Sequence, residues 1–237
     1  MGTDETAVAD GAAGDAQERR ARLEEVARRL ERAHGPPSKP RRDPLRELVL
    51  TILSQNTSDT NRDRAWERLH DRFDDWDEVR RAEPADVEEA LRPGGLAGQK
   101  SAAVQGLLED LRRERGEISL DHLEEMDDAE AMDYLTSFRR VGTKTAACVL
   151  CFALRRPVMP VDTHVDRVSR RLGLVPPGGG AAAAHRVLNE IVPPERRFPL
   201  HLQMIRHGRE VCTARNPACG DCPLEDVCPR VGVGEAA

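Results

Sequence analysis

Four cysteines near the C-terminus constrain this chain more than any other feature of its sequence. Cys212, Cys219, Cys222 and Cys228 lie within 17 residues, with the spacing C-x6-C-x2-C-x5-C. Four thiols in so short a segment cannot all enter a hydrophobic core, so we interpret them as metal ligands. Structural zinc sites usually use paired C-x2-C knuckles, whereas this segment has one such pair between wider gaps. The spacing therefore favours an iron-sulfur cluster, with zinc as the alternative.

The rest of the composition is that of a globular protein. The chain has 237 residues, of which 39% are hydrophobic, enough for one large domain or two small ones. No segment approaches the roughly 20 apolar residues that span a bilayer, and the N-terminus lacks the order of a secretory signal. We expect a cytoplasmic protein without a membrane partner. Cys148 and Cys151 lie in an apolar segment and are predicted to be buried thiols rather than a redox pair.

The formal net charge of −6 hides a strong segregation of charge. Residues 1–18 contain five acidic residues and neither Lys nor Arg. Residues 139–171 contain eight basic residues against Asp162 and Asp166, a net charge of +6. Such a patch attracts phosphates whatever the total charge of the molecule. The alternative is a pair of arginine-rich helix faces that are merely solvated.

The pattern of apolar residues predicts an all-α fold with short connections. Alternation with period two is absent, and Gly, Pro, Asp or Ser bounds each helical segment. Helices are predicted over residues 17–33, 44–53, 58–73, 75–82, 84–91, 100–115, 120–124, 128–137, 144–154, 162–172 and 201–211, with one more after a loop at 176–184. Residues 1–16 are predicted to be a disordered acidic tail. Trp66, Phe73 and Trp76 have helical neighbours typical of core packing.

Two short motifs carry chemical groups at expected helix starts. In Val141-Gly142-Thr143-Lys144-Thr145, a tight turn before a helix would point backbone N–H groups outward, where they bind a phosphate without reading a base. The alternative is an ordinary glycine turn followed by a solvated lysine. Eighteen residues after Lys144, Asp162 opens the segment that continues as Thr163-His164. Asp162 is either a helix N-cap or a functional carboxylate, and the two uses are compatible.

With these motifs in register, the sequence resembles the endonuclease III family of helix-hairpin-helix-Gly/Pro-Asp DNA glycosylases, which carry an iron-sulfur cluster. The resemblance covers roughly residues 17–230 and includes Leu53–Asp59, Gly95–Lys100, the hairpin, V-D-T-H, His207-Gly208 and the four cysteines. It implies a two-lobed helix-hairpin-helix fold, with a helical barrel domain at 43–156 and an iron-sulfur cluster domain at 17–42 and 157–237. The cleft between the lobes would hold DNA, with Lys144 and Asp162 on opposite walls.

The resemblance implies that Lys144 and Asp162 are the catalytic pair of a bifunctional DNA glycosylase and AP lyase. In this family a lysine amine displaces a damaged base and the resulting imine undergoes β-elimination, while the aspartate stabilises positive charge on the sugar. The expected substrate is duplex DNA with damaged, oxidised pyrimidines or abasic sites, and the expected cofactor is a [4Fe-4S] cluster. We expect a monomer associated with the nucleoid. The alternatives are a monofunctional glycosylase, which uses water, and a non-catalytic DNA-binding iron-sulfur module.

The resemblance also names residues that contact DNA. The base must leave the duplex before it is excised, and Gln55 or Asn56 together with Leu96 would fill the gap. Alternatively, Gln55 and Asn56 cap a helix and Leu96 belongs to the core. The other expected DNA-binding residues are Arg139, Arg140, Val141, Gly142, Thr143, Thr145 and His164.

One position departs from the family pattern. The family hairpin usually reads L-P-G-V-G, and Arg140 stands at its first glycine. A non-glycine residue there must accept a costly backbone angle or reshape the turn. The segments Ser137–Arg139 and Pro160–Asp162 also resemble the plant DNA demethylase glycosylases of the same superfamily, so a modified cytosine stays open as a substrate.

Overall fold

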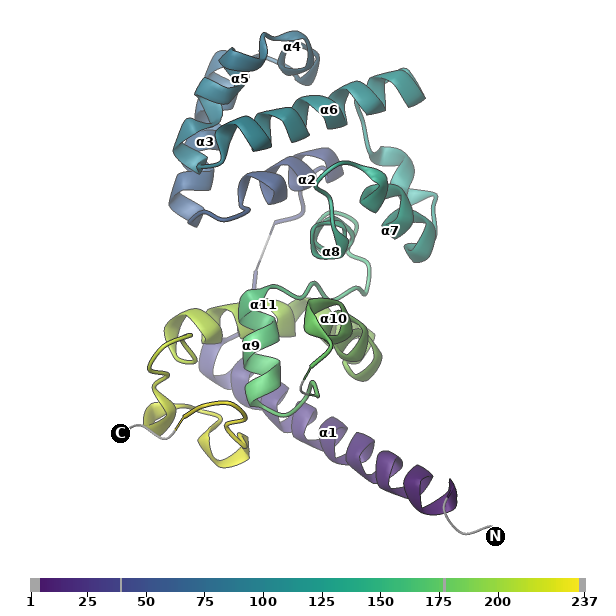
Figure 1. Cartoon of the computed structure of the whole chain (residues 1–237), viewed down its shortest axis with the longest axis vertical. Helices are drawn as coiled ribbons and strands as arrows, with labels where there is room; N and C mark the ends of the chain where they lie inside the picture. The colour runs from purple at the N-terminus through teal and green to yellow at the C-terminus, as the bar shows by residue number, and fades with distance from the viewer. Residues whose placement is uncertain (1–4, 39, 177, 235–237) are drawn as a thin grey trace. The chain divides into compact units, whose positions relative to one another are not determined.

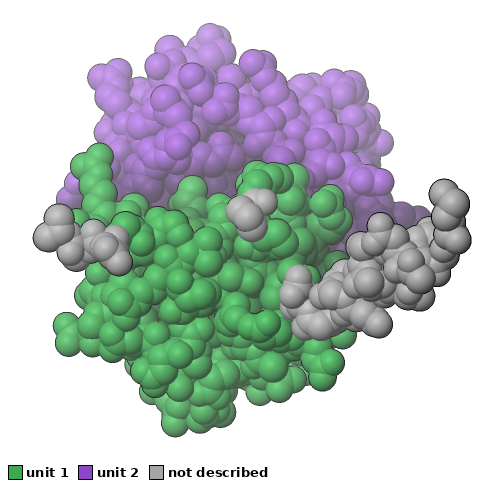
Figure 2. Space-filling view, turned by 60° about the horizontal axis from the view of Figure 1, so that its bottom comes forward, with its two compact units in different colours: residues 1–39, 157–237 green, residues 40–156 purple. Residues whose placement is uncertain are grey.

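The computed structural model describes residues 5–38, 40–176 and 178–234, with side chains from residue 17 onward. Every regular element in these ranges is a helix, which confirms the all-α prediction (Figure 1), and none of these helices is long and apolar enough to cross a membrane. The chain forms two units, coloured separately in Figure 2. Unit 1 combines Met1–Lys39 with Pro157–Ala237, and unit 2 is Pro40–Arg156. The limits expected from the sequence are 43–156 for one domain and 17–42 with 157–237 for the other.

Unit 2 contains the residues of the predicted hairpin. Its elements are α2 (Pro44–Leu53), α3 (Asp59–Arg72), α4 (Trp76–Arg81), α5 (Pro84–Leu91), α6 (Ala97–Arg115), α7 (Asp128–Ser137) and α8 (Thr143–Phe152), with the 3-10 turns η1 (Arg92–Gly94) and η2 (Asp121–Glu124). Two apolar helices, α2 and α8, form its centre. Helix α8 is buried from Thr145 to Phe152 and contacts α2 and α7. Cys148 and Cys151 are buried in it and form no disulfide, which confirms their predicted burial.

Side-chain caps mark the N-termini of several of these helices. The side chains of Asp43, Ser58, Asp75 and Asp127 accept hydrogen bonds from first-turn amides of α2, α3, α4 and α7. Such caps satisfy amides that have no acceptor within the helix. Because these signals lie next to the helices that they start, the bounds of α2 and α7 agree with the predicted ones. The bounds of α5 also agree, although this helix has no side-chain cap and begins at Pro84.

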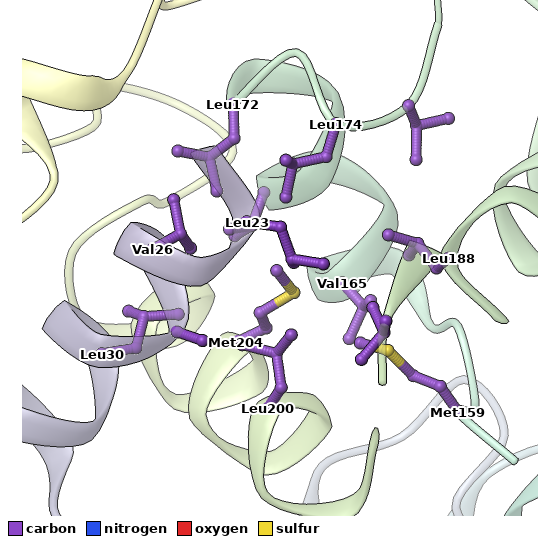
Figure 3. Close-up of a cluster of buried hydrophobic side chains, with 14 of the residues drawn as sticks. Leu23, Val26, Leu30, Met159, Val165, Leu172, Leu174, Leu188, Leu200 and Met204 are labelled. Atoms are coloured by element: carbon purple, nitrogen blue, oxygen red, sulfur yellow. The ribbon is translucent and has the colours of Figure 1, made fainter. Parts of the chain in front are cut away.

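Unit 1 joins the two ends of the sequence. Its elements are α1 (Glu5–His34), α9 (Thr163–Arg171), α10 (Gly180–Ile191) and α11 (Pro194–Glu210), followed by the 3-10 turns η3 (Cys219–Asp221) and η4 (Glu225–Val227). Figure 3 shows Leu23, Val26 and Leu30 of α1 in one apolar cluster with Leu200 and Met204 of α11. Burying each such side chain contributes about 1.5–3 kcal/mol. This cluster therefore fastens α1 to the C-terminal half of the chain.

Helices α1 and α10 begin inside segments that were expected to be irregular, because alanine is the strongest helix former. Helix α1 begins at Glu5, inside the segment 1–16 for which we expected disorder, and five of the residues from 5 to 16 are alanines. Residues 1–4 of that segment lie outside the described residues. Helix α10 begins at Gly180, inside the expected loop 176–184, and four successive alanines follow Gly180.

Helix α11 begins at Pro194 rather than at His201. Proline suits the first turn of a helix, where its missing N–H has no partner to lose. Pro199 lies inside the helix and removes one helical hydrogen bond. The burial of Leu200 and Met204, one and five residues further along the helix, offsets this loss.

The expectation that Trp66, Phe73 and Trp76 form core is wrong. All three side chains are only half-buried. The Trp66 ring lies 5.9 Å from that of Trp76 and 4.0 Å from that of His70. They therefore form a partly exposed group of unit 2 rather than part of its core.

Candidate active site and metal centre

The turn between α7 and α8 forms the hairpin predicted from the sequence. Phe138 and Val141 are buried, and the Val141 amide donates to the Phe138 carbonyl at 3.1 Å. Arg139, Arg140 and Gly142 are exposed. Two apolar side chains thus anchor the turn in unit 2, while its arginines and its glycine face outward.

Arg140 adopts the backbone conformation that favours glycine. Its φ of +65° lies in the left-handed region, which costs a non-glycine residue roughly 1–2 kcal/mol. Of the two outcomes that the sequence left open, the chain accepts the costly angle. Gln55 supports this conformation, because its Nε2 donates to the Arg140 carbonyl at 3.3 Å.

Lys144 lies in the first turn of α8, which begins without a side-chain cap. Gly142 is the N-cap residue, and the Ala146 amide donates to its carbonyl at 3.0 Å. The amides of residues 143–145 precede this bond and are open to an anion, which the helix dipole also favours. The Lys144 side chain is half-buried and forms no hydrogen bond or ion pair with another described residue. No described residue therefore engages its amine.

Asp162 is the N-cap of α9, which confirms one of its two predicted uses. Its Oδ1 accepts hydrogen bonds from the amides of His164, at 2.9 Å, and Val165, at 2.8 Å. These bonds fix the orientation of the carboxylate. Its Oδ2 has no hydrogen-bond partner among the described residues, and the side chain is half-buried. One oxygen therefore holds the group, and the other is available to a substrate.

His164 is engaged within unit 1. Its Nδ1 lies 3.1 Å from an Arg167 guanidinium nitrogen. A Cβ added to Gly208 of α11 would lie 3.0 Å from the His164 Cβ, so a larger residue there would require His164 to shift by a few tenths of an ångström. The Gly208 carbonyl accepts a hydrogen bond from Arg167 at 2.8 Å. His164 thus supports the start of α9, and its contact with DNA stays a prediction.

Asn56 and Leu96 lie on two exposed loops of unit 2. Both have a left-handed backbone, with φ of +53° and +50°, and Leu96 is 43% exposed. Leu96 is therefore not a core residue, which excludes the alternative assignment of this residue. Backbone strain of this kind persists only where the surroundings hold it, and it gathers at functional loops. Gln55 differs from both, because it is half-buried and bonded to the hairpin.

The remaining hairpin residues differ in how far their side chains are exposed to solvent. Thr143 is exposed, whereas the side chains of Val141 and Thr145 are buried. Any contact of these two residues with DNA must therefore run through the backbone.

The basic segment 139–171 is not a uniform phosphate-binding surface. Arg156 donates to the carbonyls of Leu123 and Met126, Arg167 to that of Cys212, Arg170 to those of Pro176, Gly178 and Gly180, and Arg171 to that of Thr213. These four arginines support loops, a use that the sequence did not reveal. Arg139 and Arg140 remain exposed at the hairpin.

The four C-terminal cysteines line one cavity of unit 1. They surround it together with the apolar side chains of Val168, Leu172 and Leu224. None of the four forms a disulfide, and each is half-buried. Burial raises the pKa of the Cys222 and Cys228 thiols, so their thiolate forms require a nearby positive charge such as bound iron.

Polar groups also face these sulfur atoms. Arg171 Nη1 lies 3.3 Å from Cys212 Sγ, the Leu224 amide lies 3.4 Å from Cys222 Sγ, and His207 Nε2 lies 3.6 Å from the same sulfur. Such outer contacts orient and tune metal ligands. No three His, Cys, Asp or Glu side chains of the described residues converge as around a single ion. A cluster binds its cysteines through separate irons, so its ligands need not converge on one point. The donor set therefore fits a cluster.

Comparison with known protein families identifies the fold. Residues 49–194 match the HhH-GPD superfamily of base excision DNA repair proteins. The chain belongs to this superfamily. Residues 212–228 match the iron-sulfur binding domain of endonuclease III. This second match begins at Cys212 and ends at Cys228, so the cofactor of the loop is an iron-sulfur cluster rather than zinc.

Individual relatives agree with this assignment. Endonuclease III of Thermotoga maritima is 32% identical over 216 residues, which are 90% of this chain and 96% of that protein. A DNA glycosylase of Arabidopsis thaliana is 36% identical over 187 residues, 75% of this chain but only 64% of that protein. The structure of a trapped endonuclease III–DNA covalent intermediate matches with a TM-score of 0.78 and 25% identity, over 89% of this chain and 96% of that one. The chain is thus an endonuclease III-like DNA glycosylase of base excision repair.

Proposed function

We propose that this protein is a bifunctional DNA glycosylase and AP lyase that acts on duplex DNA with oxidised pyrimidines. The observation that carries the proposal is the Lys144 amine, which has no partner among the described residues and lies at the uncapped N-terminus of α8. The open amides beside it suit a DNA phosphate. The similarity to an endonuclease III trapped covalently on DNA adds support.

In the proposed reaction the neutral Lys144 amine attacks C1′ of the damaged nucleotide. The N–C1′ bond forms while the bond from C1′ to the base breaks, and the base leaves with that electron pair and takes up a proton. Opening of the sugar ring gives an iminium ion, which acidifies the hydrogen on C2′. Loss of this proton expels the 3′ phosphate by β-elimination, and water then releases Lys144.

Asp162 is suited to assist both stages. Its Oδ1 is fixed by two amides of α9, so Oδ2 is held in a defined direction. A carboxylate placed in this way stabilises positive charge that develops on the sugar and can relay protons during elimination. Two backbone bonds hold the group before the substrate arrives, so little reorganisation is needed.

The four cysteines are proposed to hold a [4Fe-4S] cluster, which would cross-link the loop from Cys212 to Cys228. We propose that its role is structural and that the protein acts on damaged duplex DNA as a monomer. The arginine and amide contacts to this loop support such a role, because they position the loop from outside the cluster.

Borohydride trapping tests the mechanism. Wild type, Lys144→Gln and Lys144→Arg are mixed with duplexes that carry thymine glycol or an abasic site, and the imine is reduced to a stable cross-link. We expect a covalent complex with wild type alone. Lys144→Arg is the matched control, because it keeps the positive charge that attracts phosphate but lacks a nucleophilic amine. It should bind DNA nearly as well as wild type and yet fail to cleave it.

Other outcomes select the alternatives. Base release without trapping would indicate a monofunctional glycosylase that uses water. Binding of both duplexes without base release or trapping would indicate a non-catalytic module. A parallel duplex with 5-methylcytosine separates the substrate classes, since excision there but not at thymine glycol would contradict the oxidised-pyrimidine proposal while keeping the lyase mechanism.

A further inference from the structure

Lys100 of α6 is a buried cation for which the proposed reaction has no use. Its side chain is only 1% exposed, and Nζ donates to the carbonyls of Leu53, at 2.7 Å, and Gly94, at 2.8 Å. No carboxylate of the described residues forms an ion pair with it. Burial lowers the pKa of Lys100, and the Arg140 guanidinium lowers it further. Burying a charge without a counter-ion is costly. The two hydrogen bonds to carbonyls compensate part of this cost, and the presence of a lysine at this position needs an explanation.

The two carbonyls stand at the roots of the two strained loops. Leu53 ends α2, and the loop that follows it carries Asn56. Gly94 ends η1, and the loop that follows it carries Leu96. Asn56 and Leu96 are exposed, and each has the left-handed backbone described above. Lys100 thus fixes the backbone shortly before both strained residues with one ammonium group.

We propose that Lys100 is a positioning residue that holds the Asn56 loop and the Leu96 loop in one arrangement, in which both side chains enter the duplex beside the displaced nucleotide. This inference rests on the proposed function, because only an enzyme that extrudes a base has a gap to fill. The Gln55 bond to the Arg140 carbonyl extends the same framework to the hairpin. The loops and the hairpin of unit 2 therefore share one support.

The residue type agrees with this role. Only three of the 36 Lys and Arg residues are lysines, namely Lys39, Lys100 and Lys144. An ammonium directs its donors tetrahedrally from one atom, whereas a guanidinium is a larger planar fork. Lys100 fits between two carbonyls that belong to different segments, and the space beside it is limited: a Cβ added to Gly94 would lie 3.8 Å from its Nζ and 3.2 Å from the Ala65 Cβ.

The test compares two substrates of the same enzyme. Excision of thymine glycol requires a base to be displaced, whereas trapping at a preformed abasic site does not. Lys100→Met keeps the length of the side chain and removes its donors. We expect it to slow single-turnover excision about 100-fold, the usual cost of a displaced positioning group. Trapping at the abasic site should fall by no more than about threefold, because no base has to be unstacked.

A double-mutant comparison separates positioning from general stability. If Lys100 acts through the two loops, Lys100→Met should add little to the defect of the Asn56→Ala/Leu96→Ala variant. Gln105→Met is the matched control, because Gln105 lies on the same helix and its Nε2 also donates to two carbonyls, those of Val79 and Ala82. It should reduce stability without changing the ratio between the two substrates.

The proposal is overturned by equal losses on both substrates, by wild-type excision in Lys100→Met, or by defects that multiply with those of Asn56→Ala/Leu96→Ala. Lys100→Arg, which keeps a buried cation, supplies the same comparison if Lys100→Met does not fold. Wild-type excision by Asn56→Ala/Leu96→Ala, whose changes are exposed, would also overturn it. Failure of the proposed function is recognised separately, because wild type itself would then not trap. Base release still reports on Lys100 in that case.

Discussion

The two units hold their functional loops by different means. In unit 1, arginines reach backbone carbonyls far along the chain, as Arg167 does at Gly208 and Arg171 at Thr213. In unit 2, Arg156 reaches the carbonyls of Leu123 and Met126 in a similar way. The loops of Asn56 and Leu96, however, are held by the buried ammonium of Lys100, and apolar side chains anchor the hairpin. The difference shows that a count of positive charges does not locate a DNA-binding surface, because many cations of unit 1 are used inside it.

The largest expected effect is on retention of the cluster, which should depend on an arginine of unit 1 and not on Lys100 of unit 2. Arg171→Met removes the donors to Cys212 Sγ and to the Thr213 carbonyl. We expect the cluster to be lost about tenfold faster to a chelator in mild denaturant, because outer contacts of this kind typically contribute that much to metal retention. The decay of the visible absorbance of the cluster measures the rate. Lys100→Met should leave this rate unchanged, since Lys100 supports loops of unit 2.

Arg215→Met is the control for the cluster experiment. Arg215 is exposed on the loop from Cys212 to Cys228, and its side chain forms no hydrogen bond with another described residue. Its replacement should not change the rate of cluster loss. Equal acceleration by Arg171→Met and Arg215→Met would mean that positive charge near the cysteine loop matters rather than the hydrogen bonds of Arg171. The contrast between the units would then fail.

A second prediction concerns Arg140, whose backbone strain is stored in unit 2. Arg140→Gly relieves the left-handed angle, and the greater freedom of glycine in the unfolded chain cancels part of the gain. We expect the free energy of unfolding to rise by about 0.5–1 kcal/mol, as measured by denaturant titration. The same change removes an exposed cation of the hairpin. The affinity for undamaged duplex should therefore fall, with the salt slope reduced by about 1 if Arg140 contacts a phosphate.

Arg139→Gly separates the effect of backbone strain on stability from the effect of a lost positive charge on DNA affinity. Arg139 is also exposed but is not among the residues with positive φ. Glycine at this position should destabilise the protein while also weakening DNA binding. If both variants lower stability, the strain at Arg140 has no energetic consequence. If neither changes the salt slope, the hairpin binds phosphate through its amides alone.

The sequence predicts best what depends on neighbouring residues. The helix starts at residues 44 and 128, the turn before Lys144 and the cap at Asp162 all depend on short-range signals, and the structure places them where expected. Alanine-rich starts were missed because alanine lacks the apolar periodicity on which those predictions depended. The family relationship, rather than periodicity, carried the assignment of function to these motifs.

Long-range polar contacts could not be predicted. The carbonyl that Arg170 or Arg171 reaches depends on how separate segments fold back on each other, and a side-chain pattern does not encode that path. Lys100 is an intermediate case. It lies three, four and seven residues before Ala103, Val104 and Leu107, on the buried stripe of α6. A charged residue on an apolar stripe was therefore a readable signal of burial, although it did not reveal the two carbonyls.

The smallest expected effect concerns an exposed contact that links α1 to the cluster loop. Arg29 donates to the Pro223 carbonyl and to Asp226, and Glu25 accepts hydrogen bonds from Arg28 and Arg29. The bonds from Arg28 and Arg29 lower the pKa of Glu25 from its ordinary 4.5 to about 2, and Arg28 has the larger effect. Glu25→Gln should cause only a slight loss of stability at neutral pH, because exposed ion pairs contribute little.

The pH dependence of that loss has a defined sign. A carboxylate whose pKa is lowered by folding stabilises the protein above its unfolded pKa and loses this contribution as pH falls toward the folded pKa. The stability difference between wild type and Glu25→Gln should therefore be constant above pH 4.5 and shrink below it. Glu24→Gln, an exposed neighbour, controls for acid damage to the cluster. A difference that grew on acidification would show that Glu25 acts through packing, and unit 1 would then depend less on its arginines than the geometry indicates.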